Sequence, residues 1–408
     1  MAENNKAANK PRHRATSSVW AGEETELMKH VTQVPVVHSV SFGYDDVDHW
    51  KAVALGHEPG HIYGRNTNPT VEVFENKVAA LENAPAATSF STGMAAISNT
   101  LLTVLSPGDR CVSVKDTYGG TNVIFNEFFP KFGINATLCD TSDFDAIEAE
   151  IAKGCRVLYM ESPTNPTCKI MDIARLAGKA HEVGATVIVD NTFATPINQN
   201  PLELGADIVL HSATKFLGGH ADALGGVVCG TPEMIDAIYH FREITGATLH
   251  PEAAYLLLRG MKTLELRVMR QNESAMKVAQ FLQDHPFVAK VFYPGLPEHL
   301  HHDVAKQQMR GFGGMLSFQL ASDDFDAVRH FLPQLQYAHR AANLGAVETI
   351  VAPPATGSHV ELTAEERAQA GIPETLIRYS TGIEHIDDLI ADLDQALSAT
   401  QAAFATPA

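Results

Sequence analysis

The feature that most constrains the fold of this chain is an alternation of short apolar runs with longer helical patterns between residues 63 and 246. Runs such as 157–160 and 187–189 have the length and the β-branched content of buried strands, and a helical pattern such as 170–183 lies between them. This alternation predicts an α/β fold, in which helices flank both faces of a mostly parallel central sheet.

The chain divides into three expected parts. Residues 1–62 form an N-terminal arm with few strong periodic elements, residues 63–250 form the sheet domain, and residues 251–408 form a smaller C-terminal α+β domain. A long helical pattern from Glu252 to about Asp284 is expected to link the two domains. In the last part, a strand is expected at 314–320 and a terminal helix from about Ile386 to Ala403.

One apolar run ends in two hydroxyls and a lysine, in the segment Ala206-Asp-Ile-Val-Leu-His-Ser-Ala-Thr-Lys215-Phe-Leu-Gly-Gly219. A lysine among apolar neighbours at a strand end is partly desolvated, which lowers its pKa toward the range where the free amine is nucleophilic. Such an amine can hold an aldehyde as a Schiff base. Ser212 and Thr214 could bind a phosphate beside it, and the cofactor with both groups is pyridoxal phosphate. The alternative is an ordinary surface lysine.

A carboxylate ends another β-branched run, Gly184-Ala-Thr-Val-Ile-Val-Asp190. Open α/β sheets bind ligands at the carboxyl ends of their strands, so we expect Asp190 to lie near Lys215. A carboxylate there can pair with a pyridine nitrogen and keep it protonated, which makes the ring an electron sink. Read alone, Asp190 could instead cap the next turn.

Two further segments suit a flat, phosphorylated cofactor. Small residues around Gly93 and Met94 run into a helical pattern, and the first N–H groups of a helix bind anions. Tyr118 lies on a glycine turn, where its ring could stack on the cofactor. Each has a plainer alternative, namely an ordinary helix start and a tyrosine buried at a loop corner.

Together these residues resemble a family over about 25–397: the Cys/Met-metabolism group of pyridoxal-phosphate enzymes of fold type I. This group includes cystathionine γ-synthase, cystathionine γ-lyase, methionine γ-lyase and O-acetylhomoserine sulfhydrylase. The matching motifs are Tyr63-Gly-Arg65-Asn-Thr-Asn68-Pro-Thr70, Ser91-Thr-Gly-Met94, Asp116-Thr-Tyr118-Gly-Gly-Thr121, Glu161-Ser-Pro-Thr-Asn165-Pro166, Val189-Asp190-Asn-Thr192, Ser212-Ala-Thr-Lys215 with Gly218-Gly-His220, and Arg378-Tyr-Ser-Thr-Gly-Ile-Glu384.

The resemblance implies the transferase fold of fold type I and a role for each matching position. Lys215 would bind the cofactor and shuttle protons, and Tyr118 would stack on the ring and could protonate the departing group. The remaining cofactor residues would be Asp190 at the ring nitrogen and Gly93, Met94, Ser212 and Thr214 at the phosphate. Asn165 and Arg378 would bind the substrate carboxylate, with the bidentate fork that arginine supplies.

The resemblance also implies an assembly. In the family, Tyr63 and Arg65 reach the phosphate of the neighbouring subunit, and the N-terminal arm wraps a partner subunit. We therefore expect a homotetramer built from dimers with shared active sites.

Departures from the family pattern narrow the reaction. The serine that usually helps to hold the substrate carboxylate is replaced by Asn343, and the preceding glutamate of cystathionine-handling members is replaced by Ala342. Asn343, with the following segment 359–371, looks more like the O-acetylhomoserine sulfhydrylases. Methionine γ-lyases typically carry a cysteine where this chain has Gly120.

We therefore expect a γ-lyase that eliminates the γ-substituent of an amino acid. Its substrate would be an O-substituted homoserine type such as canavanine, or a sulfur amino acid such as methionine. The alternative is a γ-replacement enzyme, either an O-acylhomoserine sulfhydrylase or a cystathionine γ-synthase.

Composition excludes several other classes. With 30 Lys+Arg against 48 Asp+Glu the net charge is −18, which argues against nucleic acid or an anionic membrane as partner. The glycines near Gly218 and Gly225 do not form a Rossmann fingerprint after a first strand, which argues against a dehydrogenase. A cofactor-binding protein without turnover is disfavoured because the lysine, acid, arginine and tyrosine all remain.

The remaining expectations concern location and metals. Five cysteines without paired close spacing favour a reduced, cytoplasmic protein. No apolar run approaches a membrane span, and the N-terminal residues Lys6, Lys10, Arg12 and Arg14 predict a disordered basic arm rather than a signal peptide. The histidines between 299 and 302 predict a polar loop, and no metal site is expected.

Overall fold

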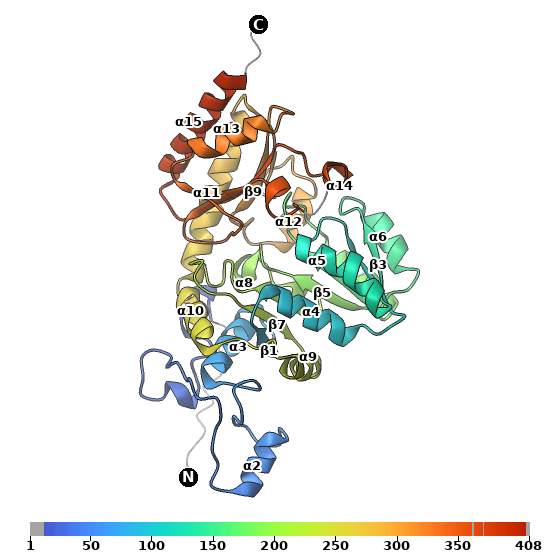
Figure 1. Ribbon diagram of the computed structural model, residues 1–408, viewed down its shortest axis with the longest axis vertical. Coiled ribbons are helices and arrows are strands. Elements are labelled where there is room, and N and C mark those ends of the chain that lie inside the picture. The colour runs from blue at the N-terminus through green and yellow to red at the C-terminus, as the bar shows by residue number, and fades with distance from the viewer. Residues whose placement is uncertain (1–11, 361–362, 370, 405–408) are drawn as a thin grey trace.

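The computed structural model describes residues 12–360, 363–369 and 371–404, and two sheets organise it (Figure 1). The larger is seven-stranded in the order β1-β7-β6-β5-β4-β2-β3. Its strands are β1 (Ala86–Phe90), β2 (Arg110–Val114), β3 (Asn135–Cys139), β4 (Val157–Glu161), β5 (Thr186–Asp190), β6 (Ile208–Ser212) and β7 (Gly226–Gly230). Strands β2 to β6 pair in parallel, and β7 runs antiparallel to both β1 and β6. The predicted mostly parallel α/β sheet is confirmed.

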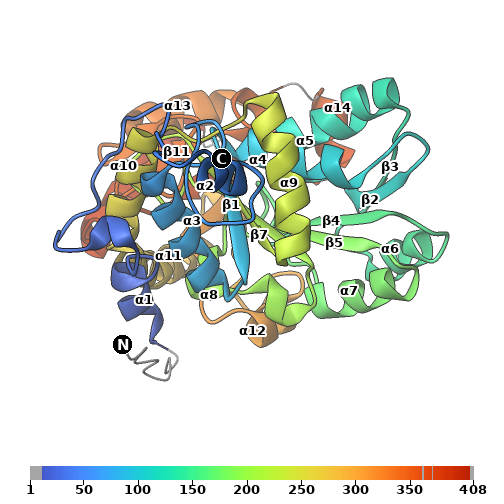
Figure 2. The same ribbon diagram turned by 90° about the horizontal axis from the view of Figure 1, so that it is seen from below.

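Apolar cores on both faces of this sheet explain its apolar sequence runs. Tyr159 of β4 packs in one core with α4 (Gly93–Val104) and α9 (Pro232–Thr245). Its neighbours Leu158 and Met160 pack in the opposite core with α6 (Phe144–Ile151) and α7 (Ile173–Glu182). Successive side chains of a strand point to opposite faces, so a strand covered on both sides is apolar throughout. Figure 2 shows α7 and α9 on opposite sides of β4 and β5.

The second sheet is five-stranded, in the order β10-β11-β12-β9-β8. Its strands are β8 (Val288–Phe292), β9 (Met315–Leu320), β10 (Ala338–Arg340), β11 (Thr349–Ala352) and β12 (Leu376–Ser380). A core of Leu, Val, Ala and Phe residues joins this sheet to α13 (Asp326–Gln334) and α15 (Ile386–Phe404). Two short helices, α12 (His302–Gln308) and α14 (Ala364–Gln369), lie in its connections. The predicted strand at 314–320 and the predicted terminal helix are both present.

The long helix expected from Glu252 to Asp284 is wrong in one respect, because it is two helices. They are α10 (Pro251–Met261) and α11 (Leu264–Asp284). Thr263 Oγ1 and Arg267 Nη2 donate hydrogen bonds to Gly260 O at 3.1 and 2.9 Å, so they satisfy a carbonyl freed where α10 ends. The helical period continues across this break, which is why the sequence pattern does not reveal it.

The N-terminal arm contains α1 (Arg14–Trp20), a short 3-10 helix (Glu26–Met28) and α2 (Val47–Ala54). Helix α1 packs against α3 (Pro69–Glu82), where the buried ammonium of Lys77 donates to Ser18 O and Val19 O. The prediction of a disordered basic arm is therefore wrong for Arg14, which begins α1, and its part at Lys6 and Lys10 lies outside the described residues. Helix α2 projects away from the body of the protein (Figure 1).

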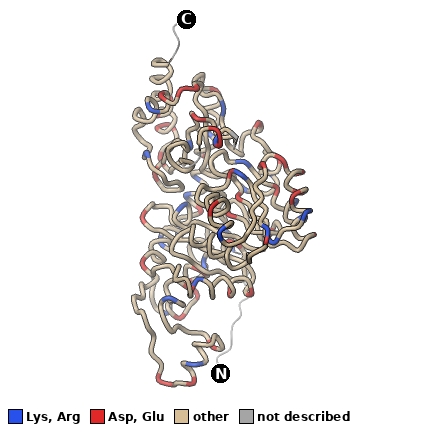
Figure 3. Tube along the Cα trace, turned by 45° about the vertical axis from the view of Figure 1, so that its right-hand side comes forward, with Lys and Arg blue, Asp and Glu red and all other residues tan. Residues whose placement is uncertain are grey.

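Acidic and basic residues are interspersed along the trace (Figure 3). Within the described part of the chain, no helix is both long and apolar enough to cross a membrane.

Candidate active site

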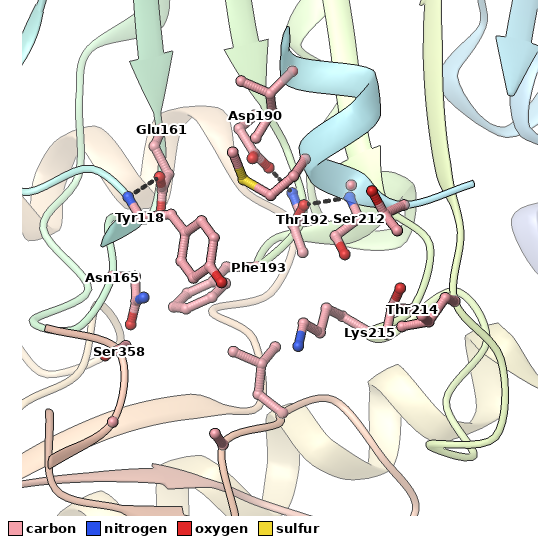
Figure 4. Close-up of a pocket in the computed structure, with 18 of the residues that line it drawn as sticks. Tyr118, Glu161, Asn165, Asp190, Thr192, Phe193, Ser212, Thr214, Lys215 and Ser358 are labelled. Atoms are coloured by element: carbon pink, nitrogen blue, oxygen red, sulfur yellow. Dashed lines mark hydrogen bonds between the residues drawn. The ribbon is translucent and has the colours of Figure 1, made fainter. Parts of the chain in front are cut away.

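A pocket of about 280 Å³ opens where β4, β5 and β6 end, between the large sheet and the small one. The strand ends supply Glu161, Asp190 and Ser212, and β12 of the small sheet supplies Arg378. Figure 4 shows the strand-end residues Asp190 and Ser212 and the nearby Lys215 around one space. The pocket brings together these residues predicted from the sequence: Gly93, Met94, Tyr118, Asn165, Asp190, Ser212, Thr214, Lys215 and Arg378.

The start of α4 forms a cradle at one end of the pocket. Thr92 caps this helix, its Oγ1 accepting from Ala95 N at 3.0 Å, and Gly93 follows as the first helical residue. A Cβ at Gly93 would lie 2.7 Å from Ser212 Oγ, so only glycine lets the helix approach the end of β6 this closely. Unpaired N–H groups of the helix start and the nearby hydroxyls of Ser212 and Thr214 suit a phosphate.

Lys215 lies in the turn after β6, with most of its side chain buried. Its Nζ donates a hydrogen bond of 2.7 Å to Asn343 Oδ1. Burial, and then the positive charge of Arg378, lower the pKa of Lys215 to about 8. This is the shift expected from the sequence, and it gives an appreciable fraction of free amine near neutral pH.

Asp190 ends β5 and is 7% exposed. Its Oδ1 accepts from Thr192 N at 2.9 Å, and Thr192 Oγ1 in turn accepts from Ser212 N, also at 2.9 Å (Figure 4). Burial raises the pKa of Asp190, while the bonds from Thr192 and the charge of His211 oppose that rise. No lysine or arginine of the described residues forms an ion pair with this carboxyl, so a ligand cation would stabilise its charged form.

Arg378 is a buried cation at the other end of the pocket, with 6% of its surface exposed. Its Nη1 donates to Asn165 Oδ1 at 3.3 Å, and its Nη2 donates to Asn343 O at 3.1 Å. Burial lowers the pKa of Arg378 to about 10. Within the described residues no carboxylate pairs with this guanidinium, so the site is prepared for an anion from outside the chain.

Tyr118 precedes α5 (Gly119–Val123), is 42% exposed, and has its ring in the pocket (Figure 4). A Cβ at Gly120 would lie 2.9 Å from Met94 Sδ and 3.0 Å from Tyr118 Cε1. A cysteine at this position would therefore displace Met94 or the tyrosine ring.

Three predicted residues do not line this pocket. One of them, Asn343, accepts hydrogen bonds from two residues that do, Lys215 and Arg378. Tyr63 is 41% exposed, and the Arg65 guanidinium lies 5.2 Å from its ring centroid. Arg65 instead lines a separate cavity formed by the arm, α3 and Arg242. The predicted role of Tyr63 and Arg65 lies in a neighbouring subunit and stays a prediction.

Several pocket residues were missed from the sequence as functional candidates. Glu161 and Thr192 stand inside recognised motifs without an assigned role, and Phe193 follows directly. Their position at strand ends beside Asp190 was the available signal. Ser358 reaches the pocket because its carbonyl packs on Gly119, where any Cβ would collide with it. No local pattern announces such a contact between distant segments.

Comparisons with known proteins agree with this geometry. The family model of Cys/Met metabolism PLP-dependent enzymes matches residues 15–398. An L-methionine gamma-lyase of Fusobacterium nucleatum subsp. polymorphum is 43% identical over 94% of this chain and 97% of its own length. An O-succinylhomoserine sulfhydrylase of Pseudomonas aeruginosa is 41% identical over 84% of this chain and 85% of its own. A solved cystathionine gamma synthase from Xanthomonas oryzae pv. oryzae superposes with a TM-score of 0.91 at 37% identity, covering 96% of this chain and 100% of that one.

The chain therefore belongs to the Cys/Met-metabolism family of pyridoxal-phosphate-dependent enzymes. It has the fold of the type I group, it uses pyridoxal phosphate, and it acts on an amino acid by γ-elimination or γ-replacement.

The residues of the pocket fit this cofactor. Pyridoxal phosphate presents a phosphate, an aldehyde and a basic ring nitrogen, and these match the glycine-dependent helix start, the buried amine and the buried carboxyl that lacks an ion-pair partner among the described residues.

Proposed function

We propose that this enzyme is a γ-lyase, which releases the γ-substituent of an amino acid without a second substrate. The substrate would be an O-substituted homoserine type such as canavanine, or a sulfur amino acid such as methionine. Similarity to an L-methionine gamma-lyase over nearly the whole chain supports elimination. A γ-replacement enzyme is the second candidate, supported by Asn343, which accepts a hydrogen bond from Lys215, and by similarity to a sulfhydrylase.

The buried guanidinium of Arg378 carries the proposal of an α-amino-acid substrate. Its nearest bonds go to two neutral oxygens, on Asn165 and Asn343, so its charge is left for a substrate carboxylate. A planar guanidinium can bind that group in two parallel hydrogen bonds. Binding there would point the amino group and the rest of the amino acid toward Lys215.

Lys215 would move the protons of the reaction. When bound, pyridoxal phosphate supplies an electron sink that acidifies the carbon beside the amino group. An amine whose pKa is about 8 can take a proton from that carbon and return one to a neighbouring carbon near neutral pH. Asn343 Oδ1 would hold the amine in place at 2.7 Å.

The remaining predicted residues would hold the cofactor and assist departure of the γ-substituent. Asp190 would keep the ring nitrogen protonated. Tyr118 would cover the ring and donate a proton to the leaving atom. The phosphate would be held by Gly93, Met94, Ser212 and Thr214, which line one end of the pocket.

The wall near the leaving group favours a substrate without a distal ammonium. Ala342 and Leu344 line the pocket there and carry no charge. Burying an ammonium against this wall would cost solvation without a partner carboxylate, which disfavours cystathionine.

We further propose the expected organisation of the molecule. Residues 1–62 would be an arm contacting a partner subunit, 63–250 the cofactor domain and 251–408 the C-terminal domain. Arg65 and Tyr63, both exposed, would complete the site of a neighbouring subunit in a homotetramer built from dimers. The cysteines, all free in the structure, support a cytoplasmic location.

A substrate panel tests the reaction. Methionine, cystathionine, O-acetylhomoserine, O-succinylhomoserine and canavanine are each supplied with and without sulfide or a thiol, while 2-oxo acid and amino-acid products are followed together. We expect turnover of at least one substrate without any nucleophile. If every substrate requires an added nucleophile, the γ-lyase proposal is wrong and the γ-replacement assignment replaces it.

A further inference from the structure

Glu161 is a buried carboxyl in the pocket that none of the proposed steps uses. It is the last residue of β4 and is 5% exposed. Its Oε2 accepts a hydrogen bond of 2.9 Å from Tyr118 N, which Figure 4 shows as a dashed line. The backbone of Asn165 also donates to this carboxyl. Glu161 therefore touches both the tyrosine expected over the ring and the loop expected at the substrate carboxylate.

The sheet places a second carboxyl beside it. Glu161 pairs with Asp190 in the parallel register of β4 and β5, so the two side chains are neighbours on one face. Two carboxyls that share a buried site cannot both ionise readily. Burial, and then the charge of Asp190, raise the pKa of Glu161 well above its usual range.

The surrounding groups favour the ionised form of one carboxyl, Asp190, over that of the other, Glu161. The hydrogen bond from Thr192 and the charge of His211 both favour the ionised form of Asp190. Glu161 forms no ion pair with any cation of the described residues, and the other acid acting on it, Asp116, is itself paired with Lys169 at 3.0 Å.

The groups that complete the surroundings of Glu161 are neutral. Tyr159 lies on its own strand, Cys168 lies near it, and Tyr118 faces it through the backbone amide. Burial raises the pKa of both the Tyr159 hydroxyl and the Cys168 thiol, so neither supplies a charge at neutral pH. The charges that act on Glu161 are therefore those of Asp190 and Asp116.

We propose that Glu161 is a positioning residue that carries the proton of the Glu161–Asp190 pair, so that Asp190 stays ionised, and that fixes Tyr118 through its backbone amide. The inference rests on the proposed roles of Asp190 and Tyr118 at the cofactor. A neutral Glu161 differs from a glutamine in little more than one atom, which makes the protonation state testable.

The first test is a pH titration of the visible absorption of bound cofactor, in the holoenzyme without substrate. We expect Glu161→Gln to leave the midpoint within about 0.3 pH unit of the wild type, because no charge is removed. A shift of about one unit or more would show that Glu161 is ionised and would overturn the proposal. Asp190→Asn is the matched control, since the same change at an ionised neighbour should move the midpoint by about one unit or more.

The second test is a double-mutant cycle read out as the dissociation constant of the cofactor. Glu161→Ala should weaken cofactor binding about tenfold in the wild-type background and much less in a Tyr118→Ala background, because the effect passes through Tyr118. Equal losses in both backgrounds would refute the positioning role. Glu161→Gln should retain binding, since its amide oxygen can still accept from Tyr118 N.

These outcomes do not depend on which reaction the enzyme performs. Absorption and cofactor affinity are measured without substrate, so an enzyme that proved to be γ-replacing would give the same result. If Glu161→Ala does not fold, the glutamine titration alone decides the protonation state.

Discussion

At the scale of single residues, Arg378 connects the two sheets at the site. It lies on β12 of the small sheet and donates a hydrogen bond to Asn165, in the loop after β4 of the large sheet. Arg378→Lys keeps the charge but loses the fork. We expect kcat/KM for the amino acid to fall by roughly 10- to 100-fold, about 1.5–3 kcal/mol, with an unchanged cofactor spectrum. Arg329→Lys, at an exposed ion pair, is the control and should behave as wild type. Unchanged kinetics in Arg378→Lys would remove this residue from carboxylate binding.

A second residue-scale prediction concerns stability and pH. Burial lowers the pKa of His299 to about 4, and its Nε2 lies 2.9 Å from Cys168 O. Between about pH 4 and 6.5 the unfolded chain binds a proton at this histidine that the folded chain does not. The free energy of unfolding is therefore unaffected by His299 above pH 6.5 and decreases as the pH falls below it. His299→Gln should remove up to about 3 kcal/mol of this pH-dependent loss.

The measurement is the free energy of unfolding in denaturant at pH 4.5 and pH 7, at one protein concentration. Glutamine can still donate to Cys168 O, so stability at pH 7 should change little. The same pH slope in variant and wild type would show that another group dominates the acid sensitivity.

At the scale of elements, two glycines in helices offer opposite predictions. Gly93→Ala puts a Cβ 2.6 Å from Ser212 Cβ, so the start of α4 must move away from β6. We expect cofactor affinity to fall about tenfold or more and the melting temperature to drop. Gly178→Ala in α7 meets nothing within 4 Å and should stabilise the protein by about 0.5–1 kcal/mol without changing affinity. Titration of apoprotein with the cofactor and thermal melts measure both, and equal affinities in the two variants would contradict the cradle.

The elements that sequence could predict are those with strong local patterns. β4 and β5 are apolar runs of the right length, and their ends at Glu161 and Asp190 follow from the strand assignments. The antiparallel β7 could not be foreseen, because pairing is decided by partners distant in the chain. The break between α10 and α11 depends on Arg267 and Thr263 reaching Gly260 O, which is a tertiary effect.

The same limit applies to the site. Lys215, Asp190 and Gly93 could be predicted because their side chains or small size suit the cofactor at the end of a strand or the start of a helix. The contact of Ser358 with Gly119 exists only once the small domain packs on the large one. The Glu161–Asp190 pair likewise requires the register of two strands, which the order of motifs does not provide.

At the scale of the whole molecule, the exposed residues Tyr63 and Arg65, which directly follow the N-terminal arm, suggest a contribution to a second subunit. Tyr63 and Arg65 are outside the pocket of their own chain, although the cradle at Gly93 suits a phosphate that a further cation would stabilise. Closed symmetric dimers place the same surface of each subunit against the other. If Arg65 of one subunit completes the site of its partner, then Arg65 of the partner completes the site of the first subunit. A subunit that lacks Lys215 and a subunit that lacks Arg65 should then form one intact active site between them.

We therefore predict complementation between Lys215→Ala and Arg65→Ala subunits. In a mixed dimer one site would carry both changes and the other neither, so random mixing of equal amounts should restore roughly a quarter of wild-type activity. Mass spectrometry of differently tagged subunits would confirm the mixed dimers. If Arg65 acted within its own chain, every site would keep one defect and mixing would restore nothing. Recovery would therefore show that Arg65 serves a neighbour, and its absence in verified mixed dimers would confine each site to one chain.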